Sequence, residues 1–114
     1  MAFETEYSVT QQSLRLSGDG RGRVAVGHEG SNRVEVAVQW PATVSAGDVE
    51  LFMIASDPES GVTLNAFAVT IVYNPNGGRV VLEIPPNLRQ VQAQVTGYTG
   101  AGEIVAIATF WRQA

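Results

Sequence analysis

The chain has 114 residues, of which 45% are hydrophobic and 16% charged, a composition that suits one folded domain and argues against disorder. It contains no cysteine and no lysine, which excludes disulfides, thiol nucleophiles, zinc–thiolate sites and lysine Schiff bases. The net charge of −4 provides no electrostatic case for nucleic acid, and no apolar run approaches the ~18 residues of a membrane span.

Residues 1–12 are mostly polar but include two aromatic side chains, Phe3 and Tyr7. This start is acidic and has no basic segment of the kind that opens a secretory signal, so we expect synthesis in the cytoplasm without a signal peptide. We expect an N-terminal arm over 1–12 and one β-sandwich domain over 13–114. The arm either frays or is held by its own sheet or by a neighbouring subunit.

Period-two alternation of apolar and polar residues predicts β-strands through the whole chain. Residues 33–40 show the cleanest pattern, which points Val34, Val36, Val38 and Trp40 inward. Turn residues separate the apolar runs, and no window sustains helical periodicity. Asp19-Gly20 predicts a hairpin between the first two strands. In chain order, strands are expected at 13–17, 23–26, 33–40, 48–55, 62–73, 79–84, 90–98 and 104–111.

The stretch 88–111 is the strongest β signal and predicts two strands joined by a glycine-bearing turn. The first strand alternates Val91, Ala93 and Val95 with glutamines, which indicates one buried and one wet face. The second strand, 104–111, is apolar on both faces. We therefore expect the core to lie against the apolar face of the first strand and against the second strand.

From 34 to 110 the pattern resembles an immunoglobulin-like or fibronectin type III-like sandwich. The resemblance rests on Gln39-Trp40-Pro41, on the strand 91–95, and on the glycines that follow it at Gly97 and Gly102. It covers roughly two-thirds of the chain, which lacks the cysteine pair of such domains and has Val91 where they have tyrosine. The resemblance implies an all-β, about eight-stranded antiparallel β-sandwich with an Ig-like Greek key. The extra strands before residue 33 leave a jelly roll open as the alternative.

The sequence contains no recognisable catalytic set, and we expect a protein that is not an enzyme and holds no cofactor or metal. His28 is the single histidine and lies in an expected loop. Asp57 and Glu59 lie close together, but in a turn where both residue types are routine. With Asp48 they could supply calcium ligands, although no loop motif connects the three.

Expected strands at 49–55, 66–73 and 104–111 are apolar on nearly every residue, which indicates a second buried surface beyond the domain core. A neighbouring subunit would supply that surface, since stable interfaces resemble a domain core cut in half. We therefore expect a structural or assembly module that forms a homo-oligomer or docks on a larger assembly, without nucleic acid or membrane. The chain is similar in style to small capsid-decoration and tail proteins of bacteriophages, which implies a place in a virion. The candidate subunit contacts are Phe3, Tyr7, Val105, Ile107, Thr109 and Trp111.

A carbohydrate-binding, lectin-like module is the alternative function. Sugars stack on exposed aromatic rings and bond to amide side chains. The candidate glycan contacts are Tyr73, Asn74, Asn76 and Tyr98, although turn formation also explains the asparagines. Trp40 and Trp111 each close an apolar run and are expected in the core.

Overall fold

A computed structural model describes residues 10–27, 30–56, 59–60, 63–84 and 90–113. All regular structure in these residues is β-strand, as expected. The eight strands are β1 (Thr10–Leu16), β2 (Gly20–Val26), β3 (Arg33–Gln39), β4 (Val44–Ser56), β5 (Thr63–Ile71), β6 (Gly78–Glu83), β7 (Gln90–Gly100) and β8 (Ile104–Trp111). Each corresponds to an expected strand, with ends that differ by a few residues. β1 begins at Thr10, so the last three residues of the expected arm already pair with β8.

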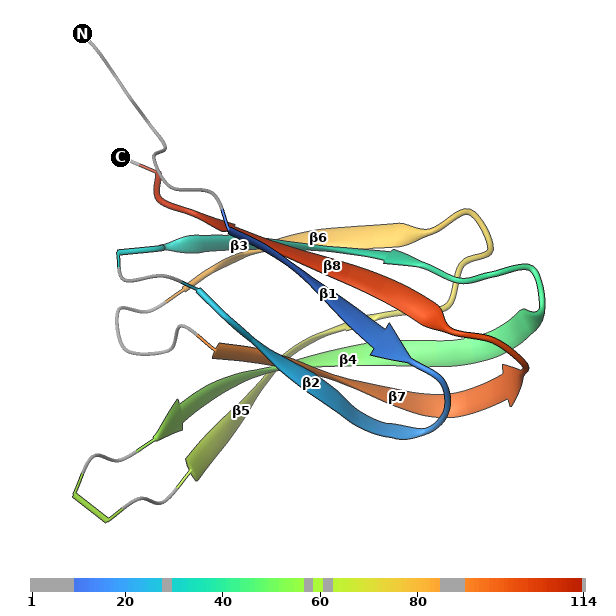
Figure 1. Ribbon diagram of the computed structural model, residues 1–114, viewed down its shortest axis with the longest axis horizontal. Helices are drawn as coiled ribbons and strands as arrows, with labels where there is room; N and C mark the ends of the chain where they lie inside the picture. The colour runs from blue at the N-terminus through green and yellow to red at the C-terminus, as the bar shows by residue number, and fades with distance from the viewer. Residues whose placement is uncertain (1–9, 28–29, 57–58, 61–62, 85–89, 114) are drawn as a thin grey trace, which may run out of the picture.

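The strands form two four-stranded antiparallel sheets packed face to face as a β-sandwich (Figure 1). Sheet A has the order β1-β8-β3-β6, and sheet B has the order β2-β7-β4-β5. The predicted fold class is thereby confirmed. β8 is a central strand of sheet A, hydrogen-bonded to β1 on one side and to β3 on the other.

Strand pairing is nested, which identifies the topology. β1 pairs with β8, β2 with β7, β3 with β6 and β4 with β5, so the chain is one long hairpin rolled over itself. This is the order of a jelly roll, the alternative left open by the sequence. The immunoglobulin-like order expected first was wrong, because there the first two strands share a sheet, whereas β1 and β2 lie in opposite sheets.

Two expected hairpins are arches that cross from one sheet to the other. The turn at Asp19-Gly20 connects β1 of sheet A to β2 of sheet B, and residues 101–103 connect β7 to β8 in the same way (Figure 1). The connection at residues 101–103 is hydrogen-bonded to the loop before β4, because the Ala101 amide donates to the Thr43 carbonyl at 3.0 Å. Gly100 there has a φ of +126°, and an added methyl group would collide with that same carbonyl.

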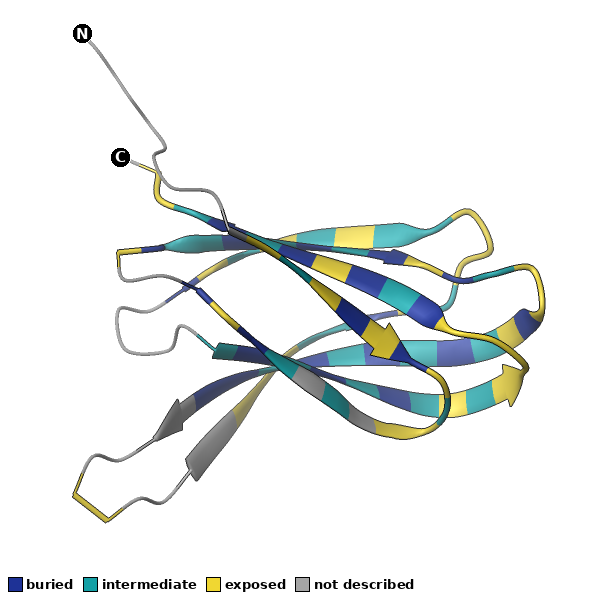
Figure 2. Cartoon of the chain, in the orientation of Figure 1, coloured by how far each residue is buried: buried dark blue, intermediate teal, exposed yellow. Residues whose placement is uncertain are grey.

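The core lies between the inner faces of the two sheets, as the alternating dark bands in Figure 2 show. Val34, Val36, Val38 and Trp40 are all buried, as the alternation predicted. The indole of Trp40 donates to the Gly47 carbonyl at 2.7 Å, which satisfies the one polar atom of this buried ring. The other fully buried large side chains are Phe110, Leu14, Leu51, Ile104, Val44, Val49, Val91 and Val95.

β8 has two different faces. Its inner residues are completely buried: Ile104, Ala106, Ala108 and Phe110. Its outer residues are half-buried or exposed, and Ile107 retains 42% of its accessible surface. The doubly apolar sequence therefore corresponds to one core face and one face that this chain leaves partly uncovered.

Alanine substitutions on the two faces of β8 should therefore differ in cost. Phe110→Ala removes a buried ring and should lower the free energy of unfolding by about 3–5 kcal/mol. Ile107→Ala, three residues earlier on the outer face, should cost less than about 1 kcal/mol. Urea denaturation of both variants checks this. Equal costs would contradict the assignment of Ile107 to an outer face.

Candidate functional site

The outer face of sheet A is the surface on which the candidate subunit contacts of β8 meet. The antiparallel register sets Ile107 between Ser13 of β1 and Ala37 of β3, with Arg79 of β6 beyond Ala37. Thr109 lies between Gln11 and Glu35, with Val81 of β6 next along the row. We call this surface the A face. It comprises Gln11, Ser13, Arg15, Arg33, Glu35, Ala37, Gln39, Arg79, Val81, Glu83, Val105, Ile107, Thr109 and Trp111.

The middle of the A face is apolar and partly uncovered. Ile107 and Val81 keep 42% and 51% of their surface exposed, while Val105 and Trp111 are half-buried. Thr109 interrupts this strip, and its hydroxyl accepts a hydrogen bond from the Gln11 amide at 3.3 Å. Trp111, which the sequence offered both as a core residue and as a candidate subunit contact, lies on the outer face. β8 ends there on its outward-facing position, and the inward position belongs to Phe110.

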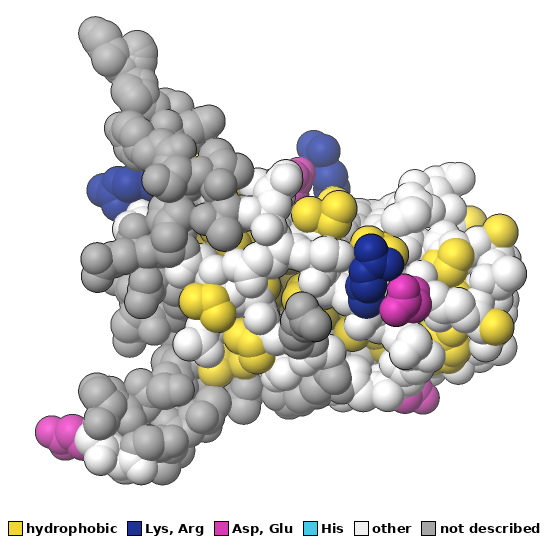
Figure 3. Space-filling view, in the orientation of Figure 1, with side chains coloured by type: hydrophobic (Ala, Val, Ile, Leu, Met, Phe, Trp, Pro, Cys, Tyr) yellow, Lys and Arg dark blue, Asp and Glu magenta, His cyan; other side chains and the backbone are white. Residues whose placement is uncertain are grey.

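Ion pairs border the apolar strip. On the β3–β6 side, Arg79 lies 3.4 Å from Glu35 and Arg33 lies 3.8 Å from Glu83. On the β1 side, Arg15 lies 3.1 Å from Glu103. Such exposed pairs stabilise a fold by about 0–1 kcal/mol each. They nevertheless place charged groups around the apolar middle of the A face. Figure 3 shows the molecule in the orientation of Figure 1, with apolar groups scattered among polar atoms on the visible side.

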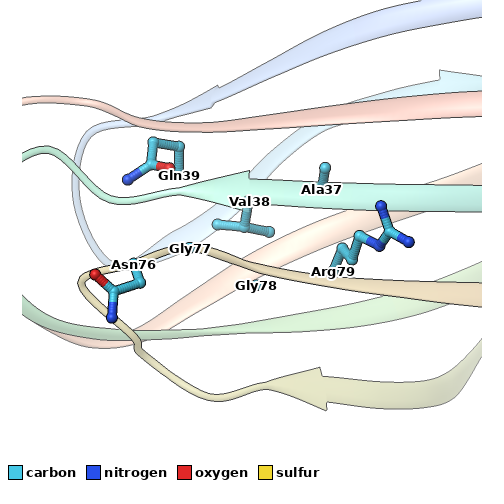
Figure 4. Close-up of a pocket in the computed structure, with 7 residues that line it drawn as sticks. All are labelled: Ala37, Val38, Gln39, Asn76, Gly77, Gly78 and Arg79. Carbon is cyan, nitrogen blue, oxygen red and sulfur yellow. The ribbon is translucent and has the colours of Figure 1, made fainter.

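A hollow of about 330 Å³ lies beside this strip, where β3 ends and β6 begins. It is lined by Ala37, Val38, Gln39 and residues 76–79 (Figure 4). The turn that forms its wall is fixed by two hydrogen bonds to Asn74. The Gly77 amide donates to the Asn74 carbonyl at 2.9 Å, and the Asn76 amide donates to the Asn74 side chain at 2.8 Å. Its lining carries one charge, on Arg79, which is already paired with Glu35.

The candidate glycan residues take part mainly in local structure. Tyr73 is half-buried against Trp40, with ring centroids 5.5 Å apart and planes at 75°, and its hydroxyl donates to the Val44 carbonyl at 3.3 Å. The Tyr98 hydroxyl donates to the Gly102 carbonyl at 2.6 Å, within the β7–β8 crossing. The Asn74 side chain fixes its own turn, and Asn76 is exposed in the same turn.

Several other candidates lie outside the described residues: Phe3, Tyr7, His28 and Asp57. Asp48, weighed as a calcium ligand, accepts a hydrogen bond from the Tyr73 amide at 2.9 Å, and Glu59 is exposed at the far end of the β4–β5 hairpin. Within the described ranges, no three histidine or acidic side chains gather as a metal site would need. No described segment is a helix that could cross a membrane.

Sequence reasoning missed an aromatic pair on the outer face of sheet B. Phe52 of β4 and Phe67 of β5 are opposite one another, with ring centroids 5.8 Å apart at 71°, and Phe67 is 57% exposed. The two strands shift register between Leu51 and Phe52, which brings these rings to the same side. Both belong to strands recognised as apolar, but the irregular register that pairs them leaves no signal in the sequence.

Comparisons with known proteins give the fold and no family. No protein-family model matches the sequence, and no curated protein matches it. Among solved structures, the chain is similar to the crystal structure of the SPBc2 prophage-derived protein YomS, with a TM-score of 0.56 and 10% sequence identity. The match covers 92% of this chain and 96% of that one. At this low identity it shows that the two proteins share an all-β sandwich fold.

Removal of the two tyrosine hydroxyls tests whether these residues are structural. Because each hydroxyl donates to a backbone carbonyl, Tyr73→Phe and Tyr98→Phe should each lower the free energy of unfolding by about 1 kcal/mol. Asn76→Ala, in an exposed turn, should change it by less than about 0.5 kcal/mol and serves as the control. Unchanged stability in both tyrosine variants, together with a sugar-array signal that they abolish, would favour the glycan interpretation instead.

Proposed function

We propose that the protein is a non-enzymatic structural module that packs against neighbouring protein subunits in an assembly, as a bacteriophage decoration or tail component does. The observation that carries this proposal is the half-exposed apolar strip of β8 in the middle of the A face. The strip lies on a central strand, so hydrogen-bonded strands flank it on both sides. A partner that covered it would find a rigid surface rather than a loop.

The chemistry of the A face matches that of a protein interface. Interfaces have an apolar middle with few charges and a polar rim that stays in contact with water. Here Val105, Ile107 and Trp111 form the middle, and the pairs Arg15–Glu103 and Arg79–Glu35 form part of the rim. The rim pairs neutralise one another, so a subunit can approach without burying an unpaired charge.

The likeness to a prophage-derived protein supports the phage context of the proposal. The fold by itself does not decide between functions, because jelly rolls occur both in viral capsid proteins and in lectins. What favours assembly here is the contrast between two surfaces. The tyrosines proposed for sugar binding are engaged in backbone hydrogen bonds, whereas the apolar Ile107 keeps 42% of its surface uncovered by the described chain.

The N-terminal segment is the second element of the proposal. Nine residues precede β1, and an extended chain of that length reaches about 30 Å. β1 is an edge strand of sheet A beside β8, so the segment leaves from the border of the A face. Phe3 and Tyr7 would then provide aromatic contacts on a neighbouring subunit.

The first test is native mass across concentration, and we expect a species heavier than the 12.2 kDa monomer. Removal of residues 1–9 keeps β1 intact and should weaken assembly. Ile107→Gln should also weaken it, by about ten-fold or more, because an apolar side chain of this size contributes strongly when buried. Val72→Gln is the matched control, since Val72 is 66% exposed but lies outside the A face.

Thermal unfolding of each variant separates loss of assembly from loss of fold. A wild-type protein that stays monomeric at high micromolar concentration, and that recovers no partner from purified virions, would overturn the proposal. Equal weakening by Ile107→Gln and Val72→Gln would show that the A face has no special role.

A further inference from the structure

Among the described strands β6 is an edge strand, and no other described strand pairs with its outer side. It bonds to β3 on one side, so the backbone groups on its other side form a template for another strand (Figure 1). Its pairing with β3 is regular from Gly78 to Glu83, and the strand contains no proline. The two edge strands of sheet B, by contrast, are broken by register shifts against β7 and β4.

The sequence of β6 is complementary to itself when reversed. Its outward side chains are Arg79, Val81 and Glu83, with the opposite charges placed evenly about the valine. If a second copy pairs antiparallel and centred on Val81, Arg79 faces Glu83 of the second copy, and Glu83 faces Arg79 of that copy. Paired residues must share a face, and among centres that satisfy this rule Val81 is the one that brings these opposite charges together.

Both charged groups are paired within the chain but remain accessible for this contact. The side chains of Arg79 and Glu83 are 74% and 84% exposed, whereas their partners on β3, Glu35 and Arg33, are 29% and 27% exposed. A second copy would extend each pair into a row of alternating charge. Arg33 and Glu83 of one copy would continue into Arg79 and Glu35 of the other, and opposite charges on adjacent strands stabilise a sheet.

Burial in β6 is incomplete on both faces. Along β3 every inward residue is fully buried, but along β6 the inward residues Val80 and Leu82 are half-buried although they pack on the core. In the same register Val80 would face Leu82 of the second copy, and Val81 would face Val81. The added strand would therefore complete the burial of the core side and cover the half-exposed Val81.

We propose that two copies of this chain associate edge to edge through β6, about a two-fold axis at Val81, into one continuous eight-stranded sheet A. This inference rests on the proposed function for the premise that the protein assembles, and it adds the partner, the edge and the register. Because the axis is perpendicular to the sheet, both A faces point to the same side. The dimer presents two apolar strips to one common surface.

Charge reversal provides a test in which two inactive variants should restore each other. Arg79→Glu places two like-charged pairs at the dyad, and so does Glu83→Arg, so each variant alone should dimerise about ten-fold more weakly than the wild type. Mixed in equal amounts, the two variants form two opposite-charge pairs and should recover the heterodimer at twice 12.2 kDa. Analytical ultracentrifugation measures all three samples.

A cross-link tests the register independently of charge. The chain has no native cysteine, so Val81→Cys introduces a unique thiol that would lie within disulfide distance of its copy at the dyad. Mild oxidation with oxidised glutathione should then give a covalent dimer on a non-reducing gel. Ser13→Cys is the control, because Ser13 is exposed on the same face but on β1, at the opposite edge, and should give little.

The outcomes separate this inference from the proposed function. Assembly that depends on Ile107 but is unchanged by Arg79→Glu and Glu83→Arg would overturn edge pairing and leave the A face proposal intact. Failure of the mixed variants to recover a dimer, with both folded by circular dichroism, would also overturn edge pairing. Recovery of the heterodimer together with weakened assembly in Ile107→Gln would support both.

Discussion

The position of β8 between β1 and β3 is the constraint on which the rest of the structure depends. The last strand of the chain fills the middle of sheet A, so the first strand has its sheet partner almost a hundred residues away, as the Gln11–Thr109 hydrogen bond records. Its inner face supplies Phe110 and Ile104 to the core, and its outer face supplies Ile107 to the A face. One strand thus contributes both to the core of the sandwich and to the candidate contact surface.

Strand positions were predictable from sequence because they depend on local pattern. Val34, Val36 and Val38 recur at every second residue and are buried as that period requires. Strand pairing was not predictable in the same way. Glycine at the β1–β2 and β7–β8 turns signals a reversal of direction, but it does not say whether the chain returns in the same sheet or crosses to the other. Two arches were therefore taken for hairpins, and an immunoglobulin-like order was preferred to the jelly roll.

The residues of the candidate site also divide into those that local sequence pattern predicts and those whose roles depend on strand pairing. Ile107 and Val105 were found because a strand that is apolar on both faces needs two buried environments, and this is visible in sequence. The symmetry of Arg79 and Glu83 about Val81 has meaning only once β6 is known to be an edge strand, which follows from the sheet order. The roles of Tyr73 and Tyr98 were equally hidden, since hydrogen bonds to Val44 and Gly102 come from the tertiary arrangement.

The nested pairing also imposes an order of events during synthesis. Contacts between residues far apart in sequence form slowly, because a long loop must close before they stabilise the fold. β8 cannot take its place in sheet A before residues 104–111 have been synthesised, and until then β3 has β6 as its sheet partner among the described strands. The A face therefore forms only after β8 has joined β1 and β3, although both of those strands are synthesised much earlier. The surface proposed for subunit contact is therefore absent until β8 is in place, so the topology would delay any association through it.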